Sequence, residues 1–123
     1  MIAHTGNFDA AIKAAETLDQ ELTKLKEAAL SRNLFLIITS DHGNIERMID
    51  PLSGEIETKH DPSPVPFYLI AKEFEKIKSE AQAEIEEKNV IGSLSDVAPT
   101  ILDLLNIAIP EEMTGKSLLK FLP

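Results

Sequence analysis

The stretch that decides the fold is Leu34-Phe35-Leu36-Ile37-Ile38-Thr39, which leads directly into Ser40-Asp41-His42-Gly43-Asn44. The first six residues form a short apolar run rich in β-formers. This is the pattern of a strand buried on both faces, as in a parallel sheet. The polar cluster that follows contains a glycine and has the character of a loop. Because ligands in open α/β sheets gather just beyond the carboxyl ends of strands, the sequence predicts an α/β fold with its chemistry at this strand end.

A helix is predicted before this strand. Apolar residues recur at steps of three and four from Phe8 to Ala29, with charged residues on the other face. This periodicity predicts an amphipathic helix that packs on a sheet. Asn7 or Thr5 is expected to cap its N-terminus, because both side chains can accept a backbone hydrogen bond there.

Three further elements are predicted after the strand. Residues 65–71 are a second strand candidate, which should start just after Pro66 or lie at a sheet edge, because proline donates no backbone hydrogen bond. Residues 73–89 are charged and predict a surface helix. Ser95 is expected to cap a last helix that runs through Leu105.

The bulk composition limits the classes of function. With 123 residues and 43% hydrophobic content, the chain can form the core of one domain. Its net charge of -9 argues against nucleic acid or an anionic membrane surface as a partner, because both favour basic patches. The absence of cysteine excludes disulfides and thiolate metal sites and fits a reducing cytoplasm. Since neither a signal peptide nor an apolar run of about 20 residues is visible, we expect a soluble cytoplasmic protein.

The three histidines suggest a metal site. His4, His42 and His60 all lie in predicted loops, and His42 directly follows Asp41 at the strand end. A ligand set of imidazole and carboxylate suits manganese or zinc. In a turn, Asp41 and His42 can point at one metal, or they can serve two metals about 4 Å apart. Local chemistry leaves open the alternative that Asp41 is only a turn former in a small α/β domain.

Five short segments occur in a characteristic order along the chain. They are His4-Thr5-Gly6 followed by Ala10–Ala14, then Asp41-His42-Gly43-Asn44, His60 with Pro64-Val65-Pro66-Phe67, Leu94–Leu105, and Glu112–Leu118. Together they closely resemble the C-terminal end of the cofactor-independent (2,3-bisphosphoglycerate-independent) phosphoglycerate mutases, members of the alkaline phosphatase superfamily. The resemblance covers nearly the whole chain apart from the charged segment at 73–89.

This resemblance implies a partial alkaline-phosphatase-like sheet flanked by helices. Residues 1–123 would be the C-terminal portion of a larger metalloenzyme domain, without a complete second domain. The family interconverts 3-phosphoglycerate and 2-phosphoglycerate in glycolysis, with two Mn²⁺ ions and a phosphoserine intermediate. By position, His4 and His60 match ligands of one metal, and Asp41 and His42 match ligands of the other. The nucleophilic serine is expected upstream, so the resemblance implies no catalytic residue in this chain.

A fragment of this kind is expected to be inactive alone and to pair with a complementary N-terminal chain, so the resemblance leaves open whether the chain by itself is an enzyme. Two alternatives remain: a non-catalytic metal-binding or interaction module, and a fragment of another enzyme of the superfamily, such as a phosphopentomutase. Around His60 the chain departs from the family, because Glu57, Lys59 and Asp61 replace the more usual histidine, small residue and threonine.

Overall fold

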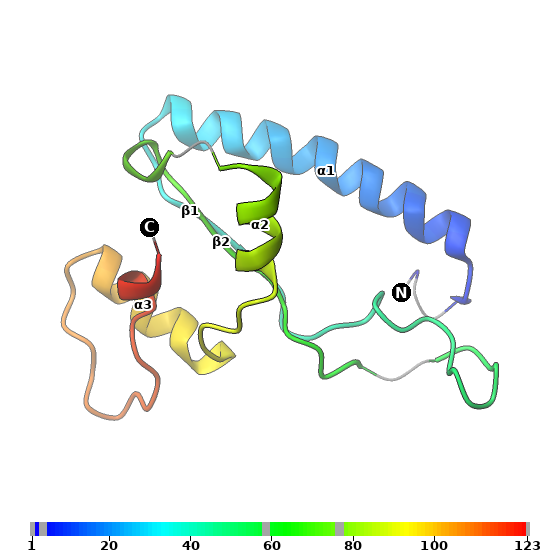
Figure 1. The fold of residues 1–123 in the computed structure, drawn as a ribbon. Helices are drawn as coiled ribbons and strands as arrows, with labels where there is room; N and C mark the ends of the chain where they lie inside the picture. The colour runs from blue at the N-terminus through cyan, green and yellow to red at the C-terminus, as the bar shows by residue number, and fades with distance from the viewer. Residues whose placement is uncertain (1, 3–4, 58–59, 76–77, 123) are drawn as a thin grey trace. The chain divides into compact units, whose positions relative to one another are not determined.

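The computed structural model describes residues 2, 5–57, 60–75 and 78–122. The chain divides into two units, Met1–Glu75 and Lys76–Pro123. The elements follow in the order α1 (Phe8–Ser31), β1 (Leu36–Thr39), β2 (Phe67–Ile70), the 3-10 turn η2 (Lys72–Phe74), α2 (Glu80–Glu87), η3 (Leu94–Asp96), α3 (Val97–Leu104) and η4 (Leu119–Phe121) (Figure 1). The predicted α/β class is confirmed. In the described part of the chain, no helix combines the length and the apolar character needed to cross a membrane.

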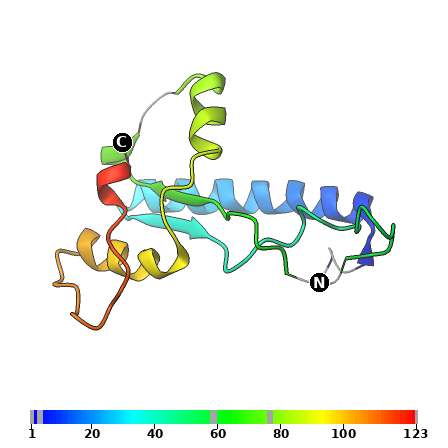
Figure 2. The same ribbon diagram turned by 60° about the horizontal axis from the view of Figure 1, so that its bottom comes forward.

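Helix α1 begins where the sequence predicts. The side chain of Asn7 accepts a hydrogen bond of 2.9 Å from the backbone N–H of Ala10, so Asn7 is the N-cap. Thr5 has a different role, because its hydroxyl donates to the carbonyl of Ile2 and accepts from the N–H of Asn7. In Figures 1 and 2, α1 runs alongside the β1–β2 ribbon, and the loop after β1 reaches the N-terminal end of the helix.

The predicted apolar face of α1 is buried at only a few positions. Ala11 forms a small core cluster with Met48 of the loop, and Ala29 is also buried. Leu18 and Leu25, in contrast, are 62% and 54% exposed. The amphipathic stripe therefore exists as predicted, but the described residues leave much of it uncovered.

The two strands pair antiparallel, from Leu36 opposite Ile70 to Thr39 opposite Phe67. The expectation of a parallel, doubly buried strand is wrong for the described residues, in which β1 is half-buried and Thr39 is exposed. A two-stranded ribbon has no neighbouring strands to bury both faces of so apolar a segment. Strand β2 starts just after Pro66, as predicted.

In the second unit the helices are shorter than predicted. Helix α2 begins after Ser79, which caps it by accepting from the N–H of Gln82, so much of the predicted segment at 73–89 is not α-helical. The expectation that Ser95 caps the last helix is wrong. Ser93 and Asp96 instead form a capping box that opens η3, and α3 follows directly.

Asp96 and Thr100 connect α3 to the C-terminal segment of this unit. The Asp96 carboxylate accepts from the backbone N–H groups of Lys116 (2.7 Å) and Ser93 (2.8 Å), and these bonds, that from Lys116 foremost, hold the pKa of Asp96 below its ordinary value. The hydroxyl of Thr100, which is fully buried, donates to the Asp96 carbonyl at 2.6 Å and accepts from the N–H of Leu118 at 2.9 Å. The side chains of Asp96 and Thr100 thus hold the C-terminal segment at Lys116 and Leu118.

Replacing Thr100 with valine should loosen the C-terminal segment at Leu118. The substitution keeps the shape of the side chain but leaves the buried N–H of Leu118 without an acceptor, which costs about 1–3 kcal/mol. Hydrogen exchange at the Leu118 amide should therefore accelerate by roughly tenfold or more. The control is Thr114→Val at an exposed position of the same segment. Unchanged exchange at Leu118 would show that the hydroxyl does not hold the segment.

Candidate metal centre

Asp41 and His42 lie in a bend that begins two residues after β1 ends. The Asp41 side chain is 86% exposed, and its Oδ1 lies 3.7 Å from Nε2 of His42. Two ligands bound to one metal at about 2.1 Å are roughly 3.0–3.4 Å apart. The distance between these two side-chain atoms is therefore close to that of two ligands of one ion.

Two hydrogen bonds fix the orientation of His42. Its Nδ1 lies 2.9 Å from the carbonyl oxygen of Gly43, and its own carbonyl accepts a 2.9 Å bond from the hydroxyl of Ser40. With Nδ1 as the donor to a carbonyl, the lone pair of the ring is on Nε2. A metal-binding histidine commonly has this arrangement, because the donated bond fixes both tautomer and ring orientation.

His60 is brought to His42 by a backbone bridge between their neighbours. Gly43 and Asp61 form an isolated antiparallel bridge, in which the N–H of Gly43 donates to Asp61 (3.0 Å) and the N–H of Asp61 donates to Gly43 (2.8 Å). The imidazole rings of His42 and His60 stack with their centroids 3.6 Å apart and their planes at 9°. Two predicted ligands from distant parts of the sequence thus lie side by side.

The Asp61 carboxylate is the buried acid of this region. The residue is 7% exposed, its Oδ1 accepts from the N–H of Ser63 at 2.8 Å, and its Oδ2 lies 3.7 Å from Nε of Arg47. The hydroxyl and backbone N–H of Ser63, and then the charge of Arg47, hold the pKa of Asp61 below its ordinary value. The pairing of Arg47 with Asp61 was not predicted, because it joins two positions 14 residues apart in the loop.

The fourth predicted ligand, His4, lies outside the described residues. Among the residues that the structure describes, no group of three or more histidine, aspartate or glutamate side chains is close enough to hold an ion. Asp41 with His42, and His42 with His60, are the pairs that the structure brings together. Their imidazole and carboxylate donors fit the chemistry of a divalent transition metal.

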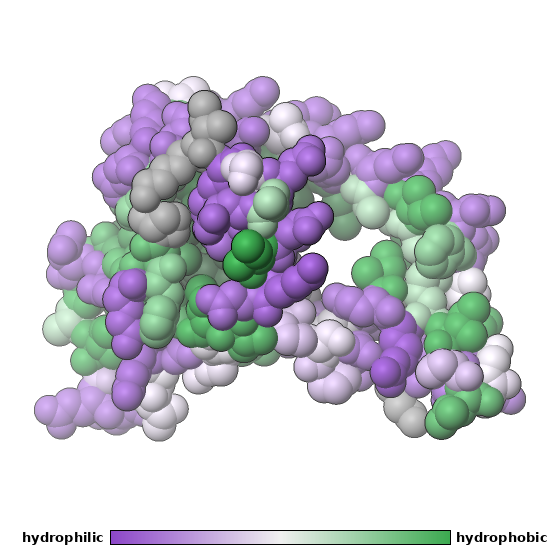
Figure 3. All heavy atoms as spheres, viewed as in Figure 1, coloured by the Kyte–Doolittle hydropathy of each residue, from purple (hydrophilic) through white to green (hydrophobic). Residues whose placement is uncertain are grey.

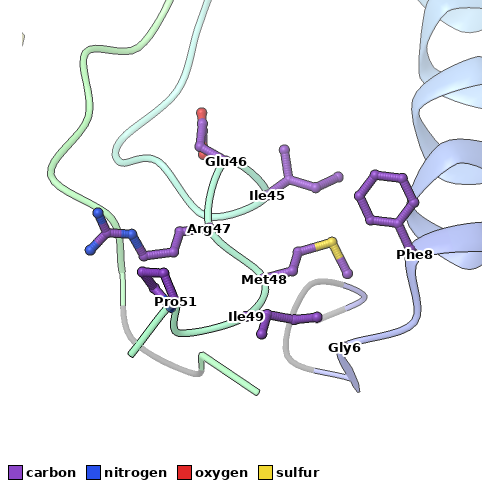
Figure 4. Close-up of a pocket in the computed structure, with 8 residues that line it drawn as sticks. All are labelled: Gly6, Phe8, Ile45, Glu46, Arg47, Met48, Ile49 and Pro51. Atoms are coloured by element: carbon purple, nitrogen blue, oxygen red, sulfur yellow. The ribbon is translucent and has the colours of Figure 1, made fainter. Parts of the chain in front are cut away.

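A separate cavity of about 370 Å³ lies between the start of α1 and the loop after β1. Figure 4 shows the Phe8 ring facing the side chains of Ile45 and Met48 across this cavity. None of the three described candidate ligands lines it. Its walls are largely apolar, so we assign the cavity no part in metal binding.

Comparison with known proteins identifies the family. The sequence profile of the metalloenzyme superfamily matches residues 1–109. The chain belongs to this superfamily. Binding of a metal is therefore a property of its family, whereas the identity of the metal is not fixed by this match.

Within the superfamily, the chain is similar to proteins named 2,3-bisphosphoglycerate-independent phosphoglycerate mutase. It is 43% identical to the protein of Francisella philomiragia over 98% of its own length, 44% to that of Clostridioides difficile over 97%, and 47% to that of Nostoc punctiforme over 98%. These matches confirm the predicted family resemblance. The chain spans about 22% of the length of each of these relatives.

Proposed function

We propose that this chain is the metal-binding C-terminal part of a phosphoglycerate mutase that interconverts 3-phosphoglycerate and 2-phosphoglycerate. The observation that carries the proposal is the similarity to such mutases over 97–98% of the chain. The geometry of the loop after β1 supports it, because the candidate ligands of that loop converge. The cytoplasmic location belongs to the same proposal, through the glycolytic reaction that the resemblance implies.

The proposed metals are two Mn²⁺ ions, with Asp41 and His42 as ligands of one and His60 with His4 as ligands of the other. The mixed donor set supports manganese over magnesium or calcium, which prefer oxygen ligands. The bond between Nδ1 of His42 and the Gly43 carbonyl supports the assignment of His42, because it leaves Nε2 for a metal. The exposed carboxylate of Asp41 beside that nitrogen supplies the negative charge that a divalent cation requires.

In the proposed enzyme the residues of this chain bind and orient rather than react. When bound, the metal ions neutralise phosphate charge and polarise its oxygens. His42 holds a fixed tautomer, and the Gly43–Asp61 bridge holds His60 beside it. The nucleophile and the phosphoglycerate-binding residues would come from a complementary N-terminal polypeptide, which we propose as the partner. Because phosphoryl transfer depends on positioning and electrostatics, half of the centre should give little turnover.

A hybrid enzyme tests this proposal. In the mutase of Nostoc punctiforme, the matching C-terminal segment is replaced by this chain, and conversion of 3-phosphoglycerate to 2-phosphoglycerate is measured with added Mn²⁺. We expect turnover by the hybrid and none by the chain alone. A hybrid that folds and binds manganese but does not convert 3-phosphoglycerate would overturn the mutase assignment in favour of a non-catalytic module or another enzyme of the superfamily, such as a phosphopentomutase.

A further inference from the structure

We propose that the Gly43–Asp61 bridge is a positioning element that sets the two proposed metal loops in register, and that Gly43 is its key residue. The inference rests on the proposed function insofar as His42 and His60 are taken as ligands. Its geometric core, that the bridge aligns the two imidazoles, is independent of any metal. Neither residue is a proposed ligand, so both would act through the histidines beside them.

The alternation of side chains explains how the bridge aligns the rings. Gly43 and Asp61 form a hydrogen-bonded antiparallel pair, so their side-chain positions share one face of the bridge. His42 and His60 each precede a bridge residue and therefore share the opposite face. Diagonal neighbours across such a pair lie within reach of ring side chains, which accounts for the observed stacking at 3.6 Å. A shift of register by one residue would move one ring to the other face.

Gly43 is required for space rather than for backbone conformation. Gly6 and Gly54 have positive φ values, whereas Gly43 is not among the described glycines with positive φ. A Cβ at Gly43 would lie 2.9 Å from the carbonyl oxygen of Asp61 and 3.3 Å from its Cβ. That oxygen is the acceptor of one bridge bond, so a side chain at position 43 would push the bridge apart.

Asp61 holds the other side of the bridge. Its carboxylate accepts from the N–H two residues ahead, in Ser63, and faces Arg47 at 3.7 Å. This turn fixes the chain that follows His60. Asp50 offers a matched comparison, because its carboxylate accepts at the same distance of 2.8 Å from the N–H of Leu52, in a turn that contains neither histidine.

The test measures ring proximity and metal affinity separately. The full chain, labelled with ¹³C-histidine, is studied by NMR at a concentration at which sedimentation shows a monomer, and the ring-current shifts of His42 and His60 report their stacking. Mn²⁺ affinity is measured by competition with a fluorescent chelator. The key pair of variants is Gly43→Ala and Gly54→Ala. At Gly54 no atom lies within 4 Å of an added Cβ, and its φ of +71° imposes backbone strain in the same loop.

We expect Gly43→Ala to lose the ring-current shifts and to weaken Mn²⁺ binding at least tenfold, whereas Gly54→Ala keeps both. The second pair, Asp61→Ala against Asp50→Ala, introduces no clash, so it remains informative if Gly43→Ala does not fold. Asp61→Ala should reduce the shifts and the affinity, and Asp50→Ala should change neither.

Shifts that persist in both Gly43→Ala and Asp61→Ala overturn the inference. A loss of the shifts with unchanged Mn²⁺ affinity keeps the alignment of the rings by the bridge but overturns its proposed role in metal binding. A wild-type chain that shows the stacked rings, loses them in Gly43→Ala and binds no Mn²⁺ supports the geometric role of the bridge but contradicts the proposed metal site.

Discussion

Substitution of His42 by alanine in the hybrid enzyme should reduce turnover of 3-phosphoglycerate by about a thousandfold or more. The residue presents Nε2 at 3.7 Å from the Asp41 carboxylate. Loss of one ligand removes an interaction that a bound metal uses to stabilise charge in the transition state, which is worth several kcal/mol. The measurement is steady-state turnover at saturating Mn²⁺, together with Mn²⁺ affinity.

The control for this prediction is Thr39→Ala, at an exposed position of β1 close to the same loop. It should leave both turnover and Mn²⁺ affinity near the values of the unsubstituted hybrid. The far-ultraviolet circular dichroism of both variants shows whether they fold. A folded His42→Ala hybrid with turnover within tenfold of the parent would remove His42 from the proposed ligand set.

The chain alone should self-associate, and two charges on the exposed face of α1 should weaken this association. Leu18 and Leu25 lie on one stripe of the helix and are more than half exposed. Hydrophobic residues also gather over the first turn of α1 and the neighbouring loop, in green at the right of Figure 3. Among the residues of these two segments, Phe8 and Ile49 are 66% and 53% exposed. Exposed apolar patches of this kind usually mark association surfaces.

Sedimentation velocity at rising concentration provides the measurement. The weight-average mass of the wild-type chain should grow with concentration, and Leu18→Glu with Leu25→Glu should shift association to at least tenfold higher concentration. Thr17→Glu with Gln20→Glu, at exposed positions of the polar face, adds the same charge and should have little effect. A wild-type chain that stays monomeric at all concentrations would show that the exposed apolar face of α1 does not drive association.

The parts of the fold that were predicted correctly are determined by residues that lie close together in the sequence. The cap at Asn7 and the start of β2 after Pro66 follow from side-chain and ring chemistry within a few residues. The direction of pairing between β1 and β2 could not be read in this way, because an apolar run indicates burial but not its partner. The cap at Ser93 has a local signal that was missed, because the Asp96 carboxylate three residues later accepts from the N–H of Ser93. The bond from the N–H of Lys116 to the same carboxylate spans 20 residues and leaves no such local pattern.

In the candidate site, too, local features were predicted from the sequence and long-range contacts were not. The sequence placed Asp41 and His42 in a turn after a strand, and the structure has them there. The approach of His60 could be expected only from the family resemblance, since a backbone bridge between distant segments leaves no periodic pattern. Gly43 and Arg47 were missed as positioning candidates, because their effects act through space on Asp61.

The bridge also implies that its two positions differ in how freely they can vary during evolution. Asp61 contributes its backbone to the bridge, and its side chain supports the bridge through the bond to Ser63 in the following turn and the contact with Arg47. Threonine, which the family resemblance implies at this position, can accept the same turn bond more weakly, so position 61 can vary among small polar residues. Gly43 contributes by having no side chain, and no other residue offers that. Although both residues form the same pair of hydrogen bonds, position 61 can therefore accept other residues, whereas position 43 requires glycine.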